Sequence, residues 1–153
     1  MPPVSAPEPL HVAGALVVDD AGRIFFQKRS GTRKLFPNTW DVVGGHVEEG
    51  ETLEDTLRRE IAEETGWQLT VVLGAVGDYT YTGEDGRQRV ETDFLVRVDG
   101  DLGRPRLEAG KHTEFRWLGP DDLTILDENR EVNHGMIRRI AEDGFAALVM
   151  LGL

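Results

Sequence analysis

The chain has 153 residues, of which 39% are hydrophobic and 29% are charged, so length and composition fit one globular domain with its own core. Its formal charge of −11 disfavours binding to a nucleic-acid polymer or to an anionic membrane surface. The absence of cysteine excludes disulfides, thiolate metal ligands and cysteine nucleophiles, and fits a cytoplasmic location. No apolar run has the length of a membrane span.

The first part of the chain is expected to contain a tail followed by short strands. Residues 1–10 hold four prolines and predict a flexible tail, which leaves residues 11–153 as the single domain. The apolar run HVAGALVV predicts a buried strand at 11–18. Across a DDAG turn, RIFFQKR at 23–29 is interpreted as the hairpin partner of that strand. The elements expected next are a polar loop at 30–39 and a brief strand at 40–43 that ends at Gly44-Gly45.

A helix is predicted directly after this segment. Thr52 can cap its N-terminus together with Asp55, in the manner of a capping box, and Gly66 can end it. Leucine and isoleucine recur every four residues between them and provide an apolar stripe.

The second half is expected to be a strand hairpin followed by a second helix. The hairpin has strands at 67–82 and 88–98 joined by the turn GEDG. A short strand at 115–118 precedes a helix at 128–142, for which Gly144 is the predicted stop. The apolar tail FAALVML is expected to pack on the core.

Three glutamates gather on one face of the first predicted helix. At about 100° per residue, Glu63 lies about 60° to one side of Glu60 and Glu64 about 40° to the other, so the carboxylates share an arc of about 100°. Their repulsion is unfavourable on a bare helix, and the C-terminal end of the helix dipole adds to it. Leu57 and Ile61 border the arc, so the carboxylates are expected beside the core. A solvated acidic face is the alternative interpretation.

The glutamates belong to a longer pattern of fixed positions. Residues 45–67 fit G-x5-E-x7-R-E-U-x-E-E-x-G-U, in which U is a bulky apolar residue. This segment resembles the Nudix box, the signature of the Nudix hydrolase family, with an aromatic residue where the last aliphatic one is usual. The matching residues are Gly45, Glu51, Arg59, Glu60, Ile61, Glu63, Glu64, Gly66 and Trp67. The resemblance implies that Glu51 and Arg59 form an ion pair, which supports the box structurally.

A fold and a metal site are also implied by the resemblance. The fold is α/β, a Nudix-type α/β/α sandwich with a central mixed sheet. Glu60, Glu63 and Glu64 would bind Mg²⁺ or Mn²⁺, hard cations that prefer carboxylate oxygen. The carbonyl of Gly45 would add a backbone ligand, because a glycine lets the backbone approach closely.

The implied reaction is metal-dependent hydrolysis, in which water attacks phosphorus in a diphosphate linkage of a nucleoside triphosphate or other nucleoside diphosphate derivative. The position of the general base varies among relatives, and Glu60 or Glu64 is one possibility. Glu114 is another catalytic candidate, because a glutamate on this later segment recurs among relatives. Glu91 and Asp93 alternate on one face of a predicted strand and are candidates for additional metal ligands.

Substrate-binding residues outside the box are predicted from residue type. Basic and aromatic side chains expected near the cleft are candidates for contacts with phosphates or with a base. These candidates are Arg29, Trp40, His46 and Tyr81. The expected partner is a small-molecule nucleotide, and a homodimer is compatible with the sequence. The sequence does not identify the nucleobase or the leaving group.

Two other functions are considered on the same scaffold. The stretch LFPNTW at 35–40 resembles the segment before the active-site cysteine of isopentenyl diphosphate isomerases, yet this chain has no cysteine. A non-catalytic nucleotide sensor is the second alternative. Such domains usually lose box glutamates or carry a DNA-binding extension, and the sequence shows neither. Hydrolysis is therefore the favoured prediction.

Overall fold

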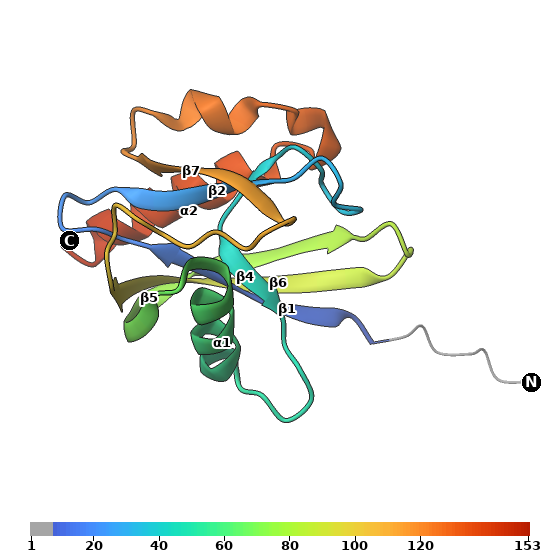
Figure 1. Ribbon diagram of the computed structural model, residues 1–153, viewed down its shortest axis with the longest axis horizontal. Coiled ribbons are helices and arrows are strands. Elements are labelled where there is room, and N and C mark those ends of the chain that lie inside the picture. The colour runs from blue at the N-terminus through green and yellow to red at the C-terminus, as the bar shows by residue number, and fades with distance from the viewer. Residues whose placement is uncertain (1–7) are drawn as a thin grey trace, which may run out of the picture.

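The computed structural model describes residues 8–153, and its strands form two sheets (Figure 1). The larger sheet contains, in spatial order, β4 (Val43–His46), β1 (Leu10–Val17), β6 (Gln88–Asp99) and β5 (Gln68–Thr82). The smaller sheet contains β3 (Trp40–Asp41), β2 (Ile24–Arg29) and β7 (His112–Leu118). Only β1 and β6 run parallel, so the larger sheet is mixed.

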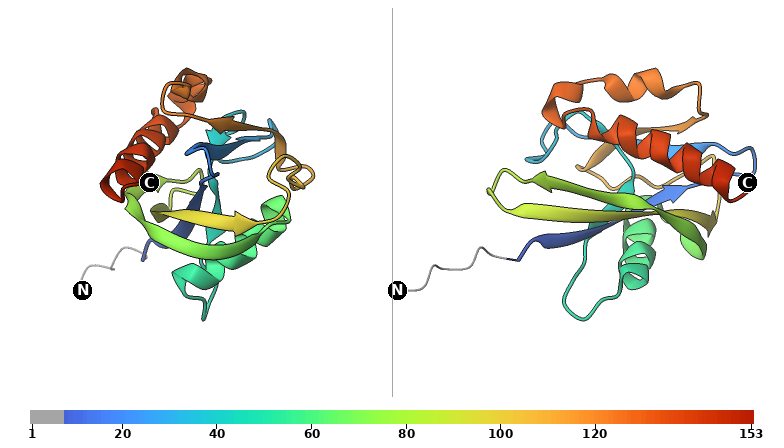
Figure 2. Two further views of the ribbon diagram at one scale, coloured as in Figure 1. Left: turned by 90° about the vertical axis from the view of Figure 1, so that its left-hand side faces the viewer. Right: turned by 180° about the vertical axis from the view of Figure 1, so that it is seen from behind.

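Two long helices cover opposite sides of the strands (Figure 2). They are α1 (Leu53–Thr65) and α2 (Met136–Met150), and two short 3₁₀ helices, η1 (Leu123–Asp127) and η2 (Arg130–Val132), lead from β7 into α2. This arrangement confirms the predicted α/β/α sandwich with a mixed sheet. Over residues 8–153, no helix is long and apolar enough to cross a membrane.

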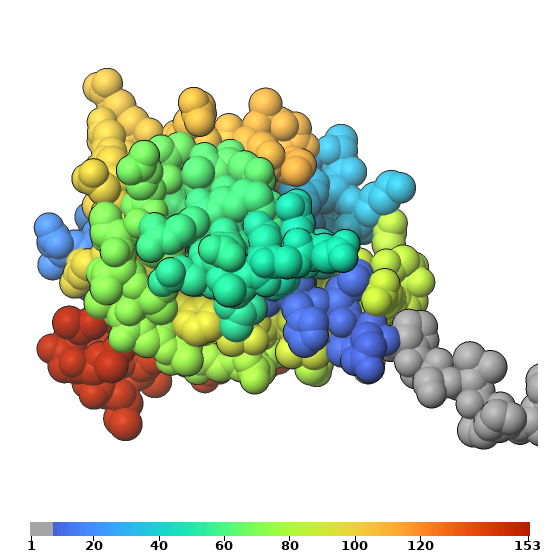
Figure 3. All heavy atoms as spheres, turned by 90° about the horizontal axis from the view of Figure 1, so that it is seen from below, coloured from blue at the N-terminus to red at the C-terminus, as the bar shows by residue number. Residues whose placement is uncertain are grey.

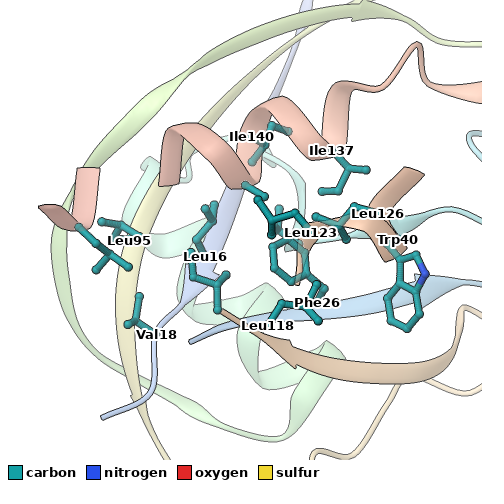
Figure 4. Close-up of a cluster of buried hydrophobic side chains, with 14 of the residues drawn as sticks. Leu16, Val18, Phe26, Trp40, Leu95, Leu118, Leu123, Leu126, Ile137 and Ile140 are labelled. Atoms are coloured by element: carbon teal, nitrogen blue, oxygen red, sulfur yellow. The ribbon is translucent and has the colours of Figure 1, made fainter. Parts of the chain in front are cut away.

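Strand β1 separates the two halves of the core, because alternate side chains point to opposite faces of a strand. Ala13 and Ala15 belong to the cluster that packs under α1. Leu16 belongs to the cluster under α2, which Figure 4 shows together with side chains from both sheets. Both helices therefore bury apolar surface against the same central strand.

The structure confirms the first predicted helix together with both of its ends. The Thr52 side chain accepts a hydrogen bond from the Asp55 backbone N–H, and the Asp55 carboxylate accepts one from the Thr52 N–H, which completes the capping box. Gly66 ends the helix with φ +78°, a left-handed conformation that glycine adopts without steric cost. The β5–β6 hairpin is also confirmed, and the short strand predicted at 115–118 is longer, since β7 begins at His112.

The predicted pairing of the first two strands is wrong. A strand is present at the predicted place, but β2 lies in the smaller sheet, and only the bridge between Val18 and Ile24 joins it to the end of β1. Both edges of β1 are already paired, one with β4 and the other with β6. Because β1 has no free edge for a third partner, the chain turns at Asp19 and continues into the other sheet.

The strand predicted at 40–43 is in fact two strands in different sheets. β3 pairs with β2, whereas β4 pairs with β1 and includes the two glycines that were expected to end the strand. A Cβ at Gly44 would overlap the carbonyl oxygen of Ala13. Glycine is therefore required here by the close approach of β1, so it does not mark a strand end.

The second helix is displaced from its predicted range of 128–142. It begins at Met136 and runs through Gly144, so this glycine is not a stop and the apolar tail FAALVML is largely helical. A Cβ at Gly144 would overlap the side chain of Leu16, so the glycine allows α2 to approach the sheet closely. Of the predicted tail at 1–10, residues 1–7 lie outside the described residues and Leu10 already belongs to β1.

Candidate active site

The three glutamates of α1 lie at increasing depth beside the larger sheet. Glu63 is exposed, Glu60 is half-buried and Glu64 is buried. The two oxygens of Glu64 accept hydrogen bonds from Gln27 Nε2 at 2.8 Å and from the Gly44 N–H at 3.0 Å. Glu64 is thus held by groups from both sheets. It forms the buried end of the row of three carboxylates, and Glu63 forms the exposed end.

The two deeper carboxylates repel each other in a partly dry environment. Burial, followed by the negative charge of Glu60, raises the pKa of Glu64 well above its usual value. Burial also raises the pKa of Glu60, against the opposing effects of its hydrogen bonds to Glu64 and Arg59. A cation placed between these groups would relieve both effects.

Arg59 braces the loop before α1 against the acidic face. Its Nε donates to Glu51 Oε2 at 2.8 Å and its Nη2 donates to Glu51 Oε1 at 3.0 Å, so the predicted ion pair is present. The guanidinium also donates to Glu60 Oε1 at 2.7 Å and to the carbonyl oxygen of His46 at 3.0 Å. The pKa of Glu51 is lowered to about 2, and the hydrogen bonds that Arg59 donates are the largest cause.

The backbone at Gly45 lies directly against the acidic helix. A Cβ at this position would overlap the carboxylate of Glu60, so only glycine allows so close an approach. Over residues 8–153, no three acidic or histidine side chains already converge as a metal cage, and Arg59 instead bonds to Glu60 and Glu63. The available donors are carboxylate and carbonyl oxygens, which are the ligands that a hard divalent cation prefers. The residues therefore fit such an ion.

A cavity of about 330 Å³ lies over the acidic face and carries opposite charges on its two sides. Its acidic side comes from the loop before α1 and from α1 itself (Figure 3, teal to green). Its basic side comes from the end of β2, the following loop and the segment before β7, where Lys111 forms an ion pair with Glu108. The charged and polar side chains that line it are Arg29, Arg33, His46, Glu48, Arg59, Glu60, Glu63, Glu64, Glu108, Lys111 and His112.

A second cavity of about 470 Å³ adjoins the first. The residues that line both cavities are Arg29, Arg33, Gly44, Gly45, His46 and Lys111. No residue of α1 is among those that line the larger cavity, whose apolar walls come from Val12, Leu35, Val42, Val43 and Tyr81. Basic residues line it as well, namely Arg29, Arg33, Lys34, Arg89 and Lys111. Its size lies in the range of about 300–1,000 Å³ that is typical of small-molecule sites.

The structure brings most of the predicted site residues together, apart from two. Glu60, Glu63, Glu64, Gly45, Arg29, His46 and Tyr81 line one or both cavities. Trp40 is 2% exposed and lies in the core beneath α2, as Figure 4 shows. Glu114 lines neither cavity, because its side chain points towards Lys28 and Arg116.

Several residues at the site were not predicted from the sequence. Gln27 is fully buried, directly after three apolar residues of β2, and supports Glu64. A polar residue next to that apolar run was the signal that could have found it. His112 places its Nε2 3.7 Å from Glu64 Oε1. Burial, followed by the charges of nearby arginines, lowers the pKa of His112 to about 3, so this imidazole is neutral at physiological pH. Glu108 lies in a loop without any local pattern that indicates its role.

Comparison with known proteins identifies the class of this fold and site. The NUDIX domain family matches residues 9–140, which is most of the chain. A solved MutT NUDIX hydrolase from Burkholderia pseudomallei has 27% identity and a TM-score of 0.69, covering 85% of this chain and 97% of its own. The MutT protein of Methanosarcina mazei superposes with a TM-score of 0.70 at 20% identity, covering 91% and 98%, and supports the fold alone.

The chain belongs to the NUDIX family and is a hydrolase of diphosphate linkages in nucleoside derivatives, a reaction for which the family uses a divalent metal. Among its curated relatives is the nucleoside triphosphatase NudI of Salmonella paratyphi B. That protein is 31% identical over 128 residues, which cover 77% of this chain and 88% of the relative. The relationship favours hydrolysis over the isomerase and sensor alternatives.

Proposed function

We propose that this chain hydrolyses nucleoside triphosphates with Mg²⁺ or Mn²⁺ held by Glu60, Glu63, Glu64 and the carbonyl oxygen of Gly45. The observation that carries the proposal is the cavity over α1, with carboxylates on one side and basic side chains on the other. When bound, a divalent cation supplies positive charge that neutralises phosphate oxygens and lowers the pKa of the attacking water. The acidic cluster makes chemical sense as a cation site, because its carboxylates otherwise repel one another.

The basic side of the cavity would bind the phosphates. Arg29, Arg33 and Lys111 line it opposite the glutamates, and guanidinium groups bind phosphate oxygens in bidentate geometry. Arg29 is held in place through its own hydrogen bonds to the Leu35 carbonyl oxygen and to Asp41 Oδ2. The nucleoside would then extend into the larger cavity. The name of the related nucleoside triphosphatase NudI supports this choice of substrate.

Glu60 is the best-placed residue to accept a proton from the attacking water. Its carboxylate lines the cavity, and burial raises its pKa above the usual value, which makes the carboxylate a stronger base. Glu64 would serve as a metal ligand in a fixed orientation, because Gln27 and the Gly44 N–H hold both of its oxygens. Glu63 is more exposed and would add charge at the outer side.

The test is a panel of ribo- and deoxyribonucleoside triphosphates, dinucleoside polyphosphates and nucleotide sugars with Mg²⁺ or Mn²⁺, with release of phosphate and pyrophosphate measured separately. We expect the wild type to hydrolyse triphosphates and the Glu60→Gln variant to lose this activity. The Glu49→Gln variant is the matched control, because Glu49 is exposed and lines neither cavity. Turnover of nucleotide sugars alone would reject the triphosphate assignment. The cytoplasmic location and the homodimer stay predictions.

A further inference from the structure

Phe36 has a backbone conformation that is unfavourable for its residue type. Its φ of +50° lies in the left-handed region, which bulky side chains rarely adopt. Pro37 follows it, and the residue before a proline prefers an extended backbone. Strain of this kind persists only where surrounding contacts hold it, and it is frequent where proteins clamp ligands. Phe36 belongs to the loop at 30–39 between β2 and β3, and residues 32–35 of that loop line the larger cavity.

Contacts on three sides fix Phe36 and the residue before it. The ring of Phe36 packs on Tyr81 of β5, with 5.4 Å between the ring centroids, and both side chains pack against the core under α2. The Phe36 carbonyl oxygen accepts a hydrogen bond from Thr39 Oγ1 at 2.7 Å. The Leu35 carbonyl oxygen accepts from Arg29 Nε at 2.9 Å and from Arg29 Nη2 at 2.7 Å. One end of the cavity-lining segment is therefore anchored to β2 and β5.

The other end of the segment is anchored by Ser30, which is buried. The Ser30 N–H donates to the carbonyl oxygen of Lys111 at 2.8 Å, and Ser30 Oγ donates to that of Gly110 at 3.0 Å. The carbonyl oxygen of Ser30 accepts from the N–H of Arg33 at 3.2 Å. Arg33 thus lies between two anchors, and both anchors attach the loop to residues that line the larger cavity, Lys111 and Tyr81 among them.

Arg33 is the basic side chain that this arrangement presents to both cavities. The other two basic side chains on the shared wall are already paired, Arg29 with Asp41 and Lys111 with Glu108. Over residues 8–153, Arg33 has no carboxylate within ion-pair distance. Burial, followed by the charge of Arg29, lowers the pKa of Arg33 below its usual value. A half-buried guanidinium without an anion is unfavourable, and phosphate oxygens would compensate for it.

We propose that Phe36 is a positioning residue for the reaction, whose packed ring and strained backbone hold Arg33 at the wall shared by the two cavities, where it binds the phosphates. Phe36 lines neither cavity, so it acts only through Arg33. A guanidinium that is already in place need not be ordered when the substrate binds, which favours both binding and reaction. This inference rests on the proposed function, because Arg33 acts on the phosphates of the substrate.

The experiment measures kcat and KM of Phe36→Ala with the triphosphate that the wild type hydrolyses best. We expect kcat/KM to fall by about 10- to 100-fold, since a misplacement of about 1 Å can cost on the order of a hundredfold. The larger part of the decrease should be an increase in KM, because a displaced Arg33 binds phosphates less tightly. Partial unfolding would instead lower the amount of active enzyme, and so the apparent kcat, without changing KM.

A double-mutant cycle with Arg33→Ala separates positioning from a general effect on packing. In the Arg33→Ala background, Phe36→Ala should change kcat/KM by less than about threefold, because the group that it positions is already absent. A decrease as large in that background as in the wild type would overturn the proposal.

Two further variants separate the role of Phe36 from the stability of the fold. Phe115→Ala makes the same change at a partly buried phenylalanine of β7 that lines neither cavity, and its KM should stay at the wild-type value. Thr39→Val keeps the shape of the side chain but removes the hydroxyl that holds the Phe36 carbonyl oxygen. It should raise KM by about threefold to tenfold, in line with the loss of one hydrogen bond. If Phe36→Ala does not fold, an unchanged KM in Thr39→Val rejects the proposal.

The outcomes also distinguish this inference from the function on which it rests. Turnover by the wild type with an unchanged KM in Phe36→Ala would overturn the role of Phe36 and leave hydrolysis intact. If the wild type hydrolyses no triphosphate, the proposed function fails. Binding of inorganic tripolyphosphate with Mg²⁺, measured by calorimetry, then tests the loop alone. We expect about tenfold weaker binding in Phe36→Ala, whereas equal affinities, or no binding by the wild type, would reject the inference.

Discussion

Two pairs of neighbouring carboxylates occupy this molecule, and their surroundings differ. Glu60 and Glu64 on α1 are met by Arg59, by Gln27 and by a backbone N–H, and they line a cavity with basic side chains opposite. Glu91 and Asp93 on β6 are met by one tyrosine hydroxyl and otherwise by each other.

Burial raises the pKa in both pairs. Arg59 bonds directly to Glu60 of the first pair, whereas Arg29, whose charge lowers the pKa of Glu91, makes its ion pair with Asp41. The role of a buried pair of acids is therefore best inferred from the hydrogen-bond donors and cations around it. A pair beside cations and phosphate-binding groups fits an ion site, whereas a pair that meets one hydroxyl and otherwise its own neighbour fits two carboxyl groups joined through a proton. Four predictions test this distinction.

The largest expected effect is on turnover in Glu64→Gln. The amide keeps the shape of the side chain but removes a negative charge from the proposed metal site. We expect kcat to fall by about a thousandfold, in the range for loss of a group that stabilises charge at a reacting centre. Steady-state phosphate release with saturating Mg²⁺ measures it. Glu54→Gln, on the exposed side of the same helix, is the control, and a decrease of less than about threefold in Glu64→Gln would remove Glu64 from the site.

The next effect concerns the brace of the first pair. Arg59→Lys retains the charge but loses the two-atom contact with Glu51, because an ammonium group cannot form the same fork. We expect a decrease of about 10- to 100-fold in kcat/KM, as is typical when residues that orient metal ligands are replaced. Arg58→Lys, at the exposed neighbouring position, should change it little. Equal activities of the two variants would show that the brace does not position the glutamates.

The third prediction concerns the packing of the second pair. Gly14→Ala introduces a Cβ that overlaps Asp93, and we expect the free energy of unfolding to fall by about 1–3 kcal/mol. Urea denaturation measures the change, and Gly103→Ala in an exposed loop is the control. The same substitution in an Asp93→Ala background should cost less. A Gly14→Ala variant as stable as the wild type would mean that Asp93 is not packed on β1.

The smallest effect is on how stability depends on pH. Burial, the largest cause, raises the pKa of Glu91 from 4.5 to about 7, so the folded state binds a proton more tightly than the unfolded state. This contribution to stability is complete below pH 4.5 and is lost as the pH rises towards 7.

Urea denaturation between pH 4.5 and pH 8 tests this slope. The double variant Glu91→Gln/Asp93→Asn should lack the part of the decrease that the pair causes, whereas Glu84→Gln should follow the wild type. Parallel curves for wild type and double variant would contradict the shared proton.

The elements that the sequence predicts correctly are those whose determining interactions are local. The capping pair Thr52 and Asp55 and the left-handed Gly66 lie within one helix, so residue types alone predict its bounds. The box was recognisable for the same reason, because nearly all of its fixed residues belong to one loop and one helix.

The errors arose where distant segments meet. Whether β2 could pair with β1 depended on β4 and β6, which occupy both edges of β1. The glycine within α2 is explained by Leu16, more than a hundred residues earlier in the chain. Trp40 lies in the core although its residue type suited a binding site, because burial depends on the tertiary fold. Glu91 and Asp93 were correctly noted as alternating on one face, and their role as additional metal ligands stays a prediction. That the nearby Arg89 and Arg29 pair with other acids follows only from the packed structure.

Arg59 competes with any metal ion for the acidic face of α1. Its guanidinium already lies against Glu60 and Glu63, so a positive charge occupies the acidic face before any ion arrives. If these glutamates hold a metal, binding is an exchange in which a mobile cation replaces a tethered one. The apparent affinity for the metal then reflects how much more strongly the carboxylate oxygens bind the metal than they bind the guanidinium of Arg59. A weaker tether would tighten metal binding even as it loosened the loop, so affinity and activity would change in opposite directions.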